Sequence, residues 1–315
     1  MCGAVIKKPR TAHICRRPMR PRRSGIRSDR QELQALMTHL DSFVQTLSPG
    51  LIRKRESYWT TPAELSDVHY PADAHQAYVA IEDRSYWFAH RNRCIVSAMR
   101  RFPPSGPILD VGGGNGVVSA ALAAAGFPCI VLEPGPRGAE AARARGLPVI
   151  QSTLEDAGLR PESVPAVGMF DVLEHIPADR ETLAALHRLL RPRGRLFLTV
   201  PALRWLWSNE DTAAGHARRY TRRSLAERLR GAGFEVESMA YMFCPLVLPV
   251  LLLRTLPSLA GRIEKPPRPP EADHILPRGW IGRTVSRMLD AEYGALTRGA
   301  RLPIGTSVLA VASKL

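Results

Sequence analysis

Short apolar runs and amphipathic stretches alternate along the middle of this chain. The apolar runs have the length of buried strands, and the stretches between them repeat apolar residues at helical spacing. The predicted strands are 107–111, 128–133, 147–151, 164–170 and 195–200, and the predicted helices are 116–125, 136–145 and 179–190. Because strands and helices take turns, we predict an α/β core over residues 106–243, with a mostly parallel sheet covered by helices on both faces.

The residues before this core predict mainly helices. A short amphipathic helix is expected at 31–47 and an irregular segment at 48–75. From Ala77 to Arg101 apolar residues recur at helical spacing, and this pattern stops at a Phe-Pro-Pro sequence. We therefore predict an N-terminal helical cap over residues 31–105.

The end of the core has clear helix signals. A helix is predicted at 221–232, with Thr221 as its N-cap and Gly233 at its end, and a strand follows at 234–243. We then predict an apolar and helical insertion over 244–300, which includes a helix near 280–298. The last unit, 301–315, contains the predicted final strand Ser307–Ala312 and a short tail.

The insertion begins with a strongly apolar segment, residues 244–261. Its uninterrupted apolar stretch is too short for a membrane-spanning helix, and prolines at 245, 249 and 257 interrupt it. Two interpretations remain open for this segment. It is either a helical lid on the core or a surface that enters one leaflet of a membrane.

The net charge of +15 is concentrated at the N-terminus. Residues 1–30 contain ten Lys and Arg against Asp29 alone, which accounts for +9 of that charge. Such a Pro/Arg-rich stretch cannot bury a core, so we predict a disordered basic tail over 1–30. It has no signal-peptide pattern, and a translation start at Met37 would remove it together with the rest of residues 1–36.

The cysteines indicate a reducing compartment. The chain has five of them and no C-x-x-C pair, which predicts free thiols in a cytoplasmic protein rather than a disulfide framework or zinc site. The apolar segment 244–261 leaves membrane association open as an addition to this localisation.

Candidate ligand-binding residues follow the predicted strands. Asp110 ends the first strand, and Gly112, Gly114 and Gly116 come directly after it, before a helix. Glycines allow a tight turn and a close approach of ligand to backbone. Glu133 ends the second strand, where a carboxylate can accept hydrogen bonds from ribose hydroxyls. Parallel sheets bind ligands at these carboxyl ends, so the pattern predicts a nucleotide-type pocket.

An NAD-dependent oxidoreductase would share the glycine turn and the acid. The G-x-G-x-x-G pattern of dinucleotide-binding proteins fits imperfectly, however, because Val117 or Ser119 stands at its third glycine, depending on the frame. The oxidoreductase remains the alternative enzyme class.

The chain resembles the class I S-adenosylmethionine-dependent methyltransferases from about Ala77 to Ala312. Four segments carry this resemblance: Ile108–Gly116, Glu133, Phe170–Ile176 and Leu189–Leu196. The segments Tyr86–Arg91, Leu206–Asp211 and His216–Thr221 resemble a subgroup with small-molecule or lipid-linked acceptors, similar to the ubiquinone-biosynthesis methyltransferases.

The resemblance implies a particular fold and cofactor. It implies a Rossmann-like seven-stranded sheet in which Ser307–Ala312 is antiparallel and lies between strands five and six. The implied cofactor is S-adenosylmethionine, bound by nine residues: Asp110, Gly112, Gly114, Gly116, Glu133, Thr153, Leu154, Glu155 and Asp171. Val164-Pro165 departs from the Phe-Asp usual in relatives at the start of strand four, which leaves the pairing there uncertain.

Two histidines are candidates for proton transfer. A hydroxyl nucleophile must lose its proton when it is methylated, and either His175 or His216 can take it. The alternative is that His175 shapes the cofactor pocket and that His216 makes a structural hydrogen bond. The resemblance also permits a divalent cation on Asp171, Glu174 and His175, although we expect no metal.

Four residues after strand five are candidates for acceptor binding. Trp207 offers an aromatic face, and Arg218 and Arg219 beside Tyr220 can bind an anionic group. We expect O-methylation of a small-molecule, glycan or lipid-linked acceptor, with peripheral membrane contact through 244–261. Nucleic acid is not the expected partner, because the Asn/Asp-Pro-Pro-aromatic run of base-methylating relatives is absent after strand four. A non-catalytic RNA- or membrane-binding module with a basic tail is the other alternative.

Overall fold

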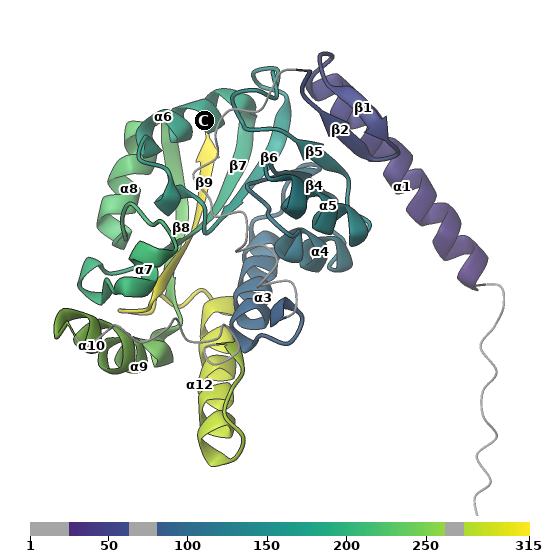
Figure 1. The fold of residues 1–315 in the computed structure, drawn as a ribbon. Coiled ribbons are helices and arrows are strands. Elements are labelled where there is room, and N and C mark those ends of the chain that lie inside the picture. Colours follow the sequence, from purple (N-terminus) through teal and green to yellow (C-terminus); the bar gives the residue numbers. More distant parts are fainter. Residues whose placement is uncertain (1–24, 63–80, 262–273) are drawn as a thin grey trace, which may run out of the picture.

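The protein is described by a computed structural model that covers residues 25–62, 81–261 and 274–315. A central sheet runs through these residues, and helices cover both of its faces (Figure 1). The predicted disordered tail falls mostly on residues 1–24, which lie outside the described residues. Residues 25–30 of the predicted tail belong to a helix.

Seven strands form the expected core. Their order across the sheet is β5-β4-β3-β6-β7-β9-β8, and β9 is antiparallel to both of its neighbours, as the resemblance implied. The strands are β3 (Ile108–Val111), β4 (Cys129–Leu132), β5 (Val149–Gln151), β6 (Val164–Phe170), β7 (Leu190–Pro201), β8 (Phe234–Met242) and β9 (Ser307–Lys314).

The described sheet has nine strands, so the predicted number of seven is wrong. The additional strands, β1 (Ile52–Arg55) and β2 (Tyr58–Thr60), form a hairpin in the segment predicted to be irregular. β2 pairs in parallel with β5 and extends the sheet at that edge. Strands this short have no readable alternation, and β2 is stabilised by burial of Tyr58 and Trp59.

Helix α1 (Gly25–Leu47) lies beside this edge of the sheet (Figure 1). Its last turns bury Leu40, Val44 and Leu47 at helical spacing, and these side chains join the core cluster that also contains Trp59. The N-terminal segment is therefore packed against the sheet edge with both a helix and strands, instead of forming a purely helical cap.

Alternate residues of each strand serve opposite faces of the sheet. In β4, Ile130 and Leu132 belong to one core cluster, which includes residues of α1, α6 (Asp179–Leu189) and α8 (Arg222–Gly231). Cys129 packs on the other face with α3 (Tyr86–Arg101), α4 (Val117–Ala124) and α12 (Trp280–Thr297). Val131 packs with α5 (Pro136–Ala144). This two-sided burial explains why the strands read as continuous apolar runs.

Two local predictions are refined by the structure. The helix predicted from Ala77 is not continuous: Ser85 caps α3 with its side chain, which accepts from the Phe88 N–H, and residues 63–80 lie outside the described residues. β6 does pair with β7, but with an irregular register between Val164 and Ala166. Pro165 lies at this irregularity, where a residue without an N–H is tolerated.

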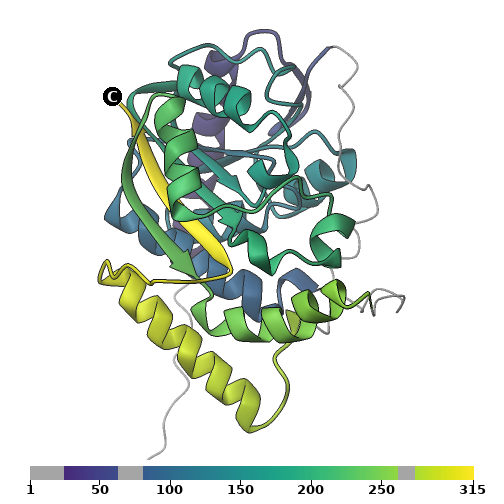
Figure 2. The same cartoon turned by 90° about the vertical axis from the view of Figure 1, so that its left-hand side faces the viewer.

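The apolar segment after β8 forms four short helical elements in succession. They are η3 (Cys244–Leu246), α9 (Val247–Val250), the π-helical turn η4 (Leu251–Thr255) and α10 (Leu256–Leu259). Among the described residues, no helix combines the length and the apolar character required to cross a membrane. Figure 2 shows α9, α10 and α12 together at the lower end of the molecule.

Candidate active site

The predicted cofactor turn follows β3 directly. Gly112, Gly114 and Gly116 have φ values of 69°, 52° and 75°, a region that favours glycine. A Cβ on Gly112 would lie 2.8 Å from the Val172 side chain, and one on Gly116 would lie 2.7 Å from Leu147. The turn thus requires glycine for its backbone conformation at all three positions and also for space at two of them.

Two buried carboxyl groups flank this turn. Glu133 accepts hydrogen bonds from the N–H groups of Gly114 (2.9 Å) and Gly135 (2.8 Å), yet burial raises its pKa to about 7. Asp110 accepts from the Ser119 hydroxyl at 2.6 Å, and burial raises its pKa to about 6. Glu133 is therefore a group whose charge changes near neutral pH and which contacts the glycine turn directly.

The loop after β5 contains the other predicted adenine contacts. Thr153 donates to the Asp156 carboxylate at 2.8 Å, Leu154 packs partly against the core, and Glu155 is exposed. Ser152 was not among the predicted site residues. Its hydroxyl is fully buried at the carboxyl end of β5 and has no hydrogen-bond partner among the described residues.

Asp171, at the end of β6, is held by a residue that sequence reasoning missed. The Arg91 guanidinium lies 2.6 Å from the Asp171 carboxylate and sits over the rings of Trp87 and Phe88, at 4.8 and 4.9 Å from their centroids. Arg91 comes from α3, 80 residues earlier in the chain. The aromatic residues before Arg91 could be recognised in the sequence, but the pairing of Arg91 with Asp171 could not.

A second group of residues that sequence reasoning missed makes hydrogen bonds to the glycine turn. The Asn115 amide donates to Glu82 at 2.9 Å, and Arg145 donates to the carbonyl of Asn115 at 2.9 Å. Arg145 also pairs with Glu82 at 3.1 Å. The residues just before α3 and at the end of α5 therefore fix the conformation of the turn.

Glu174, His175 and His216 form a compact cluster. One potential ligand atom from each of them lies within 4.8 Å of the other two. Burial and the charge of Asp171 raise the pKa of Glu174 well above its usual range, and one of its oxygens has no hydrogen-bond partner in the described part of the chain. Burial and the nearby His216 lower the pKa of His175 to about 4, so that His175 is neutral at pH 7.

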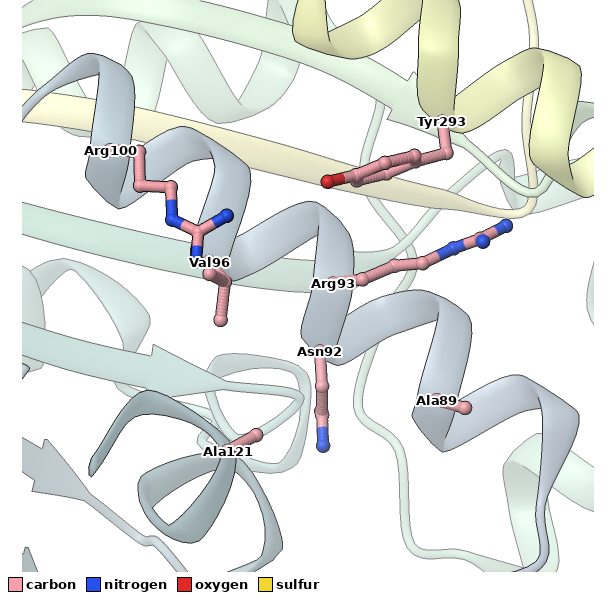
Figure 3. A pocket seen from close by; sticks show the side chains of 7 residues that line it. All are labelled: Ala89, Asn92, Arg93, Val96, Arg100, Ala121 and Tyr293. Carbon is pink, nitrogen blue, oxygen red and sulfur yellow. The ribbon is translucent and has the colours of Figure 1, made fainter. Parts of the chain in front are cut away.

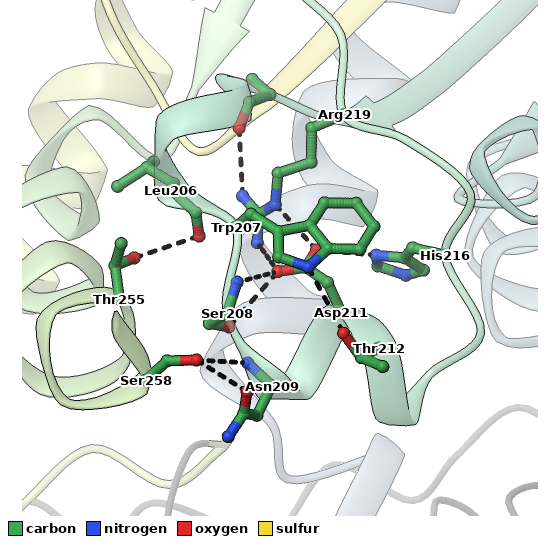
Figure 4. A network of polar contacts seen from close by, with 11 residues as sticks. Leu206, Trp207, Ser208, Asn209, Asp211, Thr212, His216, Arg219, Thr255 and Ser258 are labelled. Carbon is green, nitrogen blue, oxygen red and sulfur yellow. Dashed lines mark hydrogen bonds and ion pairs between the residues drawn. The ribbon is translucent and has the colours of Figure 1, made fainter. Parts of the chain in front are cut away.

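Asp211 orients His216. The His216 Nδ1 lies 2.8 Å from the Asp211 carboxylate, which also accepts from Arg219 at 2.7 and 2.9 Å and from the Ser208 N–H (Figure 4). Burial opposes its charge, but the hydrogen bonds from His216 and Arg219 outweigh burial and lower the pKa of Asp211 to about 2. An ionised Asp211 makes Nδ1 the donor, and this leaves Nε2 of a neutral His216 as a proton acceptor.

A cavity of about 500 Å³ adjoins this network. Three of the four predicted acceptor-binding residues line it, namely Trp207, Arg218 and Arg219, together with Arg204 and Ala217. Arg218 pairs with Asp179 at 2.6 Å and Arg219 with Asp211, so both guanidinium groups are already neutralised. Tyr220 lies outside this lining, because its hydroxyl is buried and donates to Asp179 at 2.9 Å.

Arg204 differs from the other two arginines of this cavity. It is exposed, and it has no ion-pair partner among the residues that the structure describes. Sequence reasoning missed it because an arginine after a strand has no distinctive spacing.

A second cavity, of about 410 Å³, lies between α3, α4 and α12 (Figure 3). Its lining includes Arg93, Arg100 and Tyr293, but none of the predicted cofactor, catalytic or acceptor residues. The predicted site residues lie instead in β3 and in the segments that follow β3, β4, β5, β6 and β7.

Known proteins share this architecture and these motifs. A family model described as a methyltransferase domain matches residues 82–239, which is half of the chain. The chain therefore belongs to the methyltransferase-domain family, within the class of S-adenosylmethionine-dependent methyltransferases. This membership confirms the resemblance noted in the sequence and gives no support to the oxidoreductase interpretation.

Curated relatives match part of this chain. The ubiquinone biosynthesis O-methyltransferase of Vibrio atlanticus is 32% identical over 100 residues, which are 30% of this chain and 42% of the relative. A Xanthomonas oryzae enzyme of the same name is 33% identical over a similar share. The matched part thus spans less than half the length of these curated relatives.

Solved structures share the fold. A methyltransferase from Haloferax volcanii, solved with the Trm112 methyltransferase activator, is 18% identical and has a TM-score of 0.51, covering 78% of this chain and 99% of that one. The Haemonchus contortus phosphoethanolamine N-methyltransferase 2, solved with S-adenosylmethionine, is 16% identical with a TM-score of 0.49, covering 78% of this chain and 58% of that one.

Proposed function

We propose that this protein is a cytoplasmic methyltransferase that transfers a methyl group from S-adenosylmethionine to an oxygen of a small-molecule, glycan or lipid-linked acceptor. The observation that carries the proposal is the position of His216. The Asp211 carboxylate contacts Nδ1 of its imidazole. The same carboxylate binds Arg219, which lines the acceptor cavity. A proton acceptor is thus oriented beside a cavity at the carboxyl edge of the sheet.

The cofactor would lie along the glycine turn. Gly112, Gly114 and Gly116 let a ligand approach the backbone, and the Glu133 carboxylate beside the turn would accept hydrogen bonds from the two ribose hydroxyls. The adenine would lie near the loop after β5, which contributes Thr153, Leu154, Glu155 and the unpartnered hydroxyl of Ser152.

The chain's own residues would assist transfer by proton removal and positioning. Bound S-adenosylmethionine supplies a methyl group that its sulfonium already activates. His216 Nε2 accepts the proton of the acceptor hydroxyl, and Asp211 stabilises the resulting imidazolium at Nδ1. His216 is the better base of the two predicted histidines, because the lowered pKa of His175 makes it a weak proton acceptor at neutral pH.

Arg204 would recognise an anionic group on the acceptor. Arg218 and Arg219 are occupied by Asp179 and Asp211, so they shape the cavity more than they supply free charge. The unpaired guanidinium of Arg204 is the one that suits a carboxylate or phosphate.

A metal-assisted variant of this reaction is favoured by one observation, the Glu174–His175–His216 cluster. One carboxyl group and two imidazoles are donors that suit a divalent cation such as Mn²⁺, and the Glu174 oxygen that lacks a partner among the described residues fits that role. In the structure His216 belongs to this set of potential ligands. Asp171, which was the third predicted ligand, pairs with Arg91 instead. In this variant the three residues would hold a cation that lowers the pKa of the acceptor hydroxyl.

Chelation separates the two variants. Full retention of activity after exhaustive chelation would refute the metal-assisted variant. Loss of activity that is restored by Mn²⁺, together with calorimetric Mn²⁺ binding that disappears in Glu174→Gln, would support it.

Calorimetry with S-adenosylhomocysteine tests the cofactor site. We expect binding by the wild type, strong weakening by Glu133→Ala, and no change in the control Glu227→Ala, whose carboxylate pairs with Arg223 on the surface. Binding of NAD instead would overturn the proposal. Comparing metabolites of a deletion strain, with a search for the loss of one methyl increment, would identify the acceptor.

A further inference from the structure

The helical segment that follows β8, residues 244–259, is held rigidly on one side. The Thr255 hydroxyl is buried and donates to the carbonyl of Leu206 at 3.1 Å. Ser258 donates to the Asn209 side chain at 2.7 Å and accepts from the Asn209 N–H at 3.1 Å (Figure 4). These bonds join the segment to the wall of the acceptor site, so its orientation relative to that site is fixed.

The other side of this segment is apolar and exposed. Five of its seven leucines are between 47% and 76% exposed, whereas Leu246 is buried and Leu251 is partly buried. We call this side the leucine face, and it consists of Leu248, Leu252, Leu253, Leu256 and Leu259. Several large apolar side chains exposed on one short segment of a folded chain indicate an interaction surface.

Helix α12 has a second group of exposed apolar side chains in its N-terminal half. Trp280 is 71% exposed, and Ile281 and Met288 are exposed two turns apart on the same helix. The Glu292 carboxylate accepts from the N–H groups of Phe243 and Cys244, which ties α12 to the start of the segment. Figures 1 and 2 both show α9, α10 and α12 at the lower end of the molecule.

The carboxyl edge of the sheet faces the same end. β9 runs up to the C-terminus in Figure 1, and its first residue, Ser307, pairs with Pro201 at the end of β7. The parallel strands therefore end on the side where the leucine face lies. A surface that docks through this face would present the acceptor cavity to its partner.

The charged side chains of residues 244–261 and of the described residues from 274 to the middle of α12 are all basic. Residues 244–261 contain no Asp or Glu, and neither do the first ten residues of α12. Arg278, Arg283 and Arg287 are exposed beside Trp280, and Asp290 further along is paired with Arg93 at 2.6 Å. A second copy of the chain would bring like charges together, whereas the head groups of an anionic bilayer would neutralise them.

We infer that the leucine face and the exposed edge of α12 dock on a bilayer that contains anionic phospholipids. The leucines enter the boundary between head groups and acyl chains, Trp280 lies at the head-group level, and the arginines contact phosphates. This inference rests on the proposed function in one respect, because docking brings the cavity to an acceptor that is lipid-linked. Binding to the bilayer itself does not require methyl transfer.

Vesicle flotation of the full chain tests the inference. We expect binding to vesicles of phosphatidylcholine and phosphatidylglycerol in equal parts, and weak binding to phosphatidylcholine alone. Leu252→Ser combined with Leu256→Ser should weaken partitioning at least about tenfold, because each leucine loses apolar insertion. Ile52→Ser, on the exposed edge strand β1, is the matched control and should bind as the wild type does.

The arginines have a separate test. Arg283→Gln with Arg287→Gln should weaken binding to the anionic vesicles by about tenfold or more and leave the weak binding to phosphatidylcholine unchanged. Unchanged binding of the leucine variant would overturn the inference and assign binding to another part of the chain. Dimers of the wild type that dissociate in the leucine variant would also overturn it. Calorimetry with S-adenosylhomocysteine should be unaffected by these substitutions, so failure here is distinguishable from failure of the cofactor proposal.

Discussion

Glu133 should make both cofactor affinity and stability depend on pH near neutrality. Burial raises the pKa of this carboxyl from an ordinary 4.5 to about 7 in the free protein. In the proposed cofactor site the ribose hydroxyls would donate to the ionised form, so the affinity for S-adenosylhomocysteine should fall as the carboxylate is protonated. Between about pH 8 and about pH 6 the ionised fraction drops roughly tenfold, which corresponds to about 1.4 kcal/mol of binding free energy.

The same group affects folding in the opposite direction. Below the unfolded pKa the carboxyl is protonated in both states, and its contribution to stability is fully present. As pH rises toward about 7, the unfolded chain loses its proton first, so the stability of the free protein decreases by about 3 kcal/mol in total. High pH should therefore favour cofactor binding while it weakens the cofactor-free fold.

Titration calorimetry and thermal unfolding across this pH range measure the two effects. Glu133→Gln should bind S-adenosylhomocysteine weakly at every pH and should lose most of the pH dependence of binding. Asp110, whose pKa burial raises to about 6, should leave a smaller residual slope in the stability of the variant. If the variant kept the affinity of the wild type at about pH 8, or its full pH slope, the reasoning on Glu133 would be refuted.

Three other substitutions test separate parts of the site. Asp211→Asn should lower kcat by about 10²–10⁴-fold with little change in S-adenosylhomocysteine affinity, because His216 would lose the partner that orients it; unchanged kcat would contradict this role. Arg204→Gln should raise the KM for an anionic acceptor about tenfold and leave kcat nearly constant, as steady-state kinetics would show. Gly112→Ala should lower the free energy of unfolding by about 2 kcal/mol or more, because it adds a clash to an unfavourable φ. The control Gly126→Ala has a positive φ but open space around it, so denaturant unfolding should show a loss of about 1 kcal/mol.

Much of the core could be predicted because its signals are local. A parallel strand buried on both faces must be apolar throughout, and the glycine turn needs three positive φ values within five residues, so both leave a readable pattern. The cap at Thr221 was predictable for the same reason, since its side chain bonds the N–H three residues later. The resemblance then placed β9 correctly between β7 and β8.

The errors have equally physical causes. β1 and β2 were missed because short edge strands gain their stability from a neighbouring strand and from α1 rather than from alternation within themselves. The start of α1 was missed because the basic composition of residues 25–30 outweighed a helical pattern that begins further along the chain.

The sequence by itself determined the α/β core, the glycine turn, the acid at Glu133 and the class of enzyme. Each depends on residues close together in the chain or on motifs shared with a family. Only the tertiary structure decided which side chains act together. Arg91 reaches Asp171 across 80 residues, Asp211 is shared by His216 and Arg219, and Thr255 is buried in a segment that exposes five leucines. Such pairings depend on how the strands and helices pack, so they cannot be predicted from the spacing of residues along the chain.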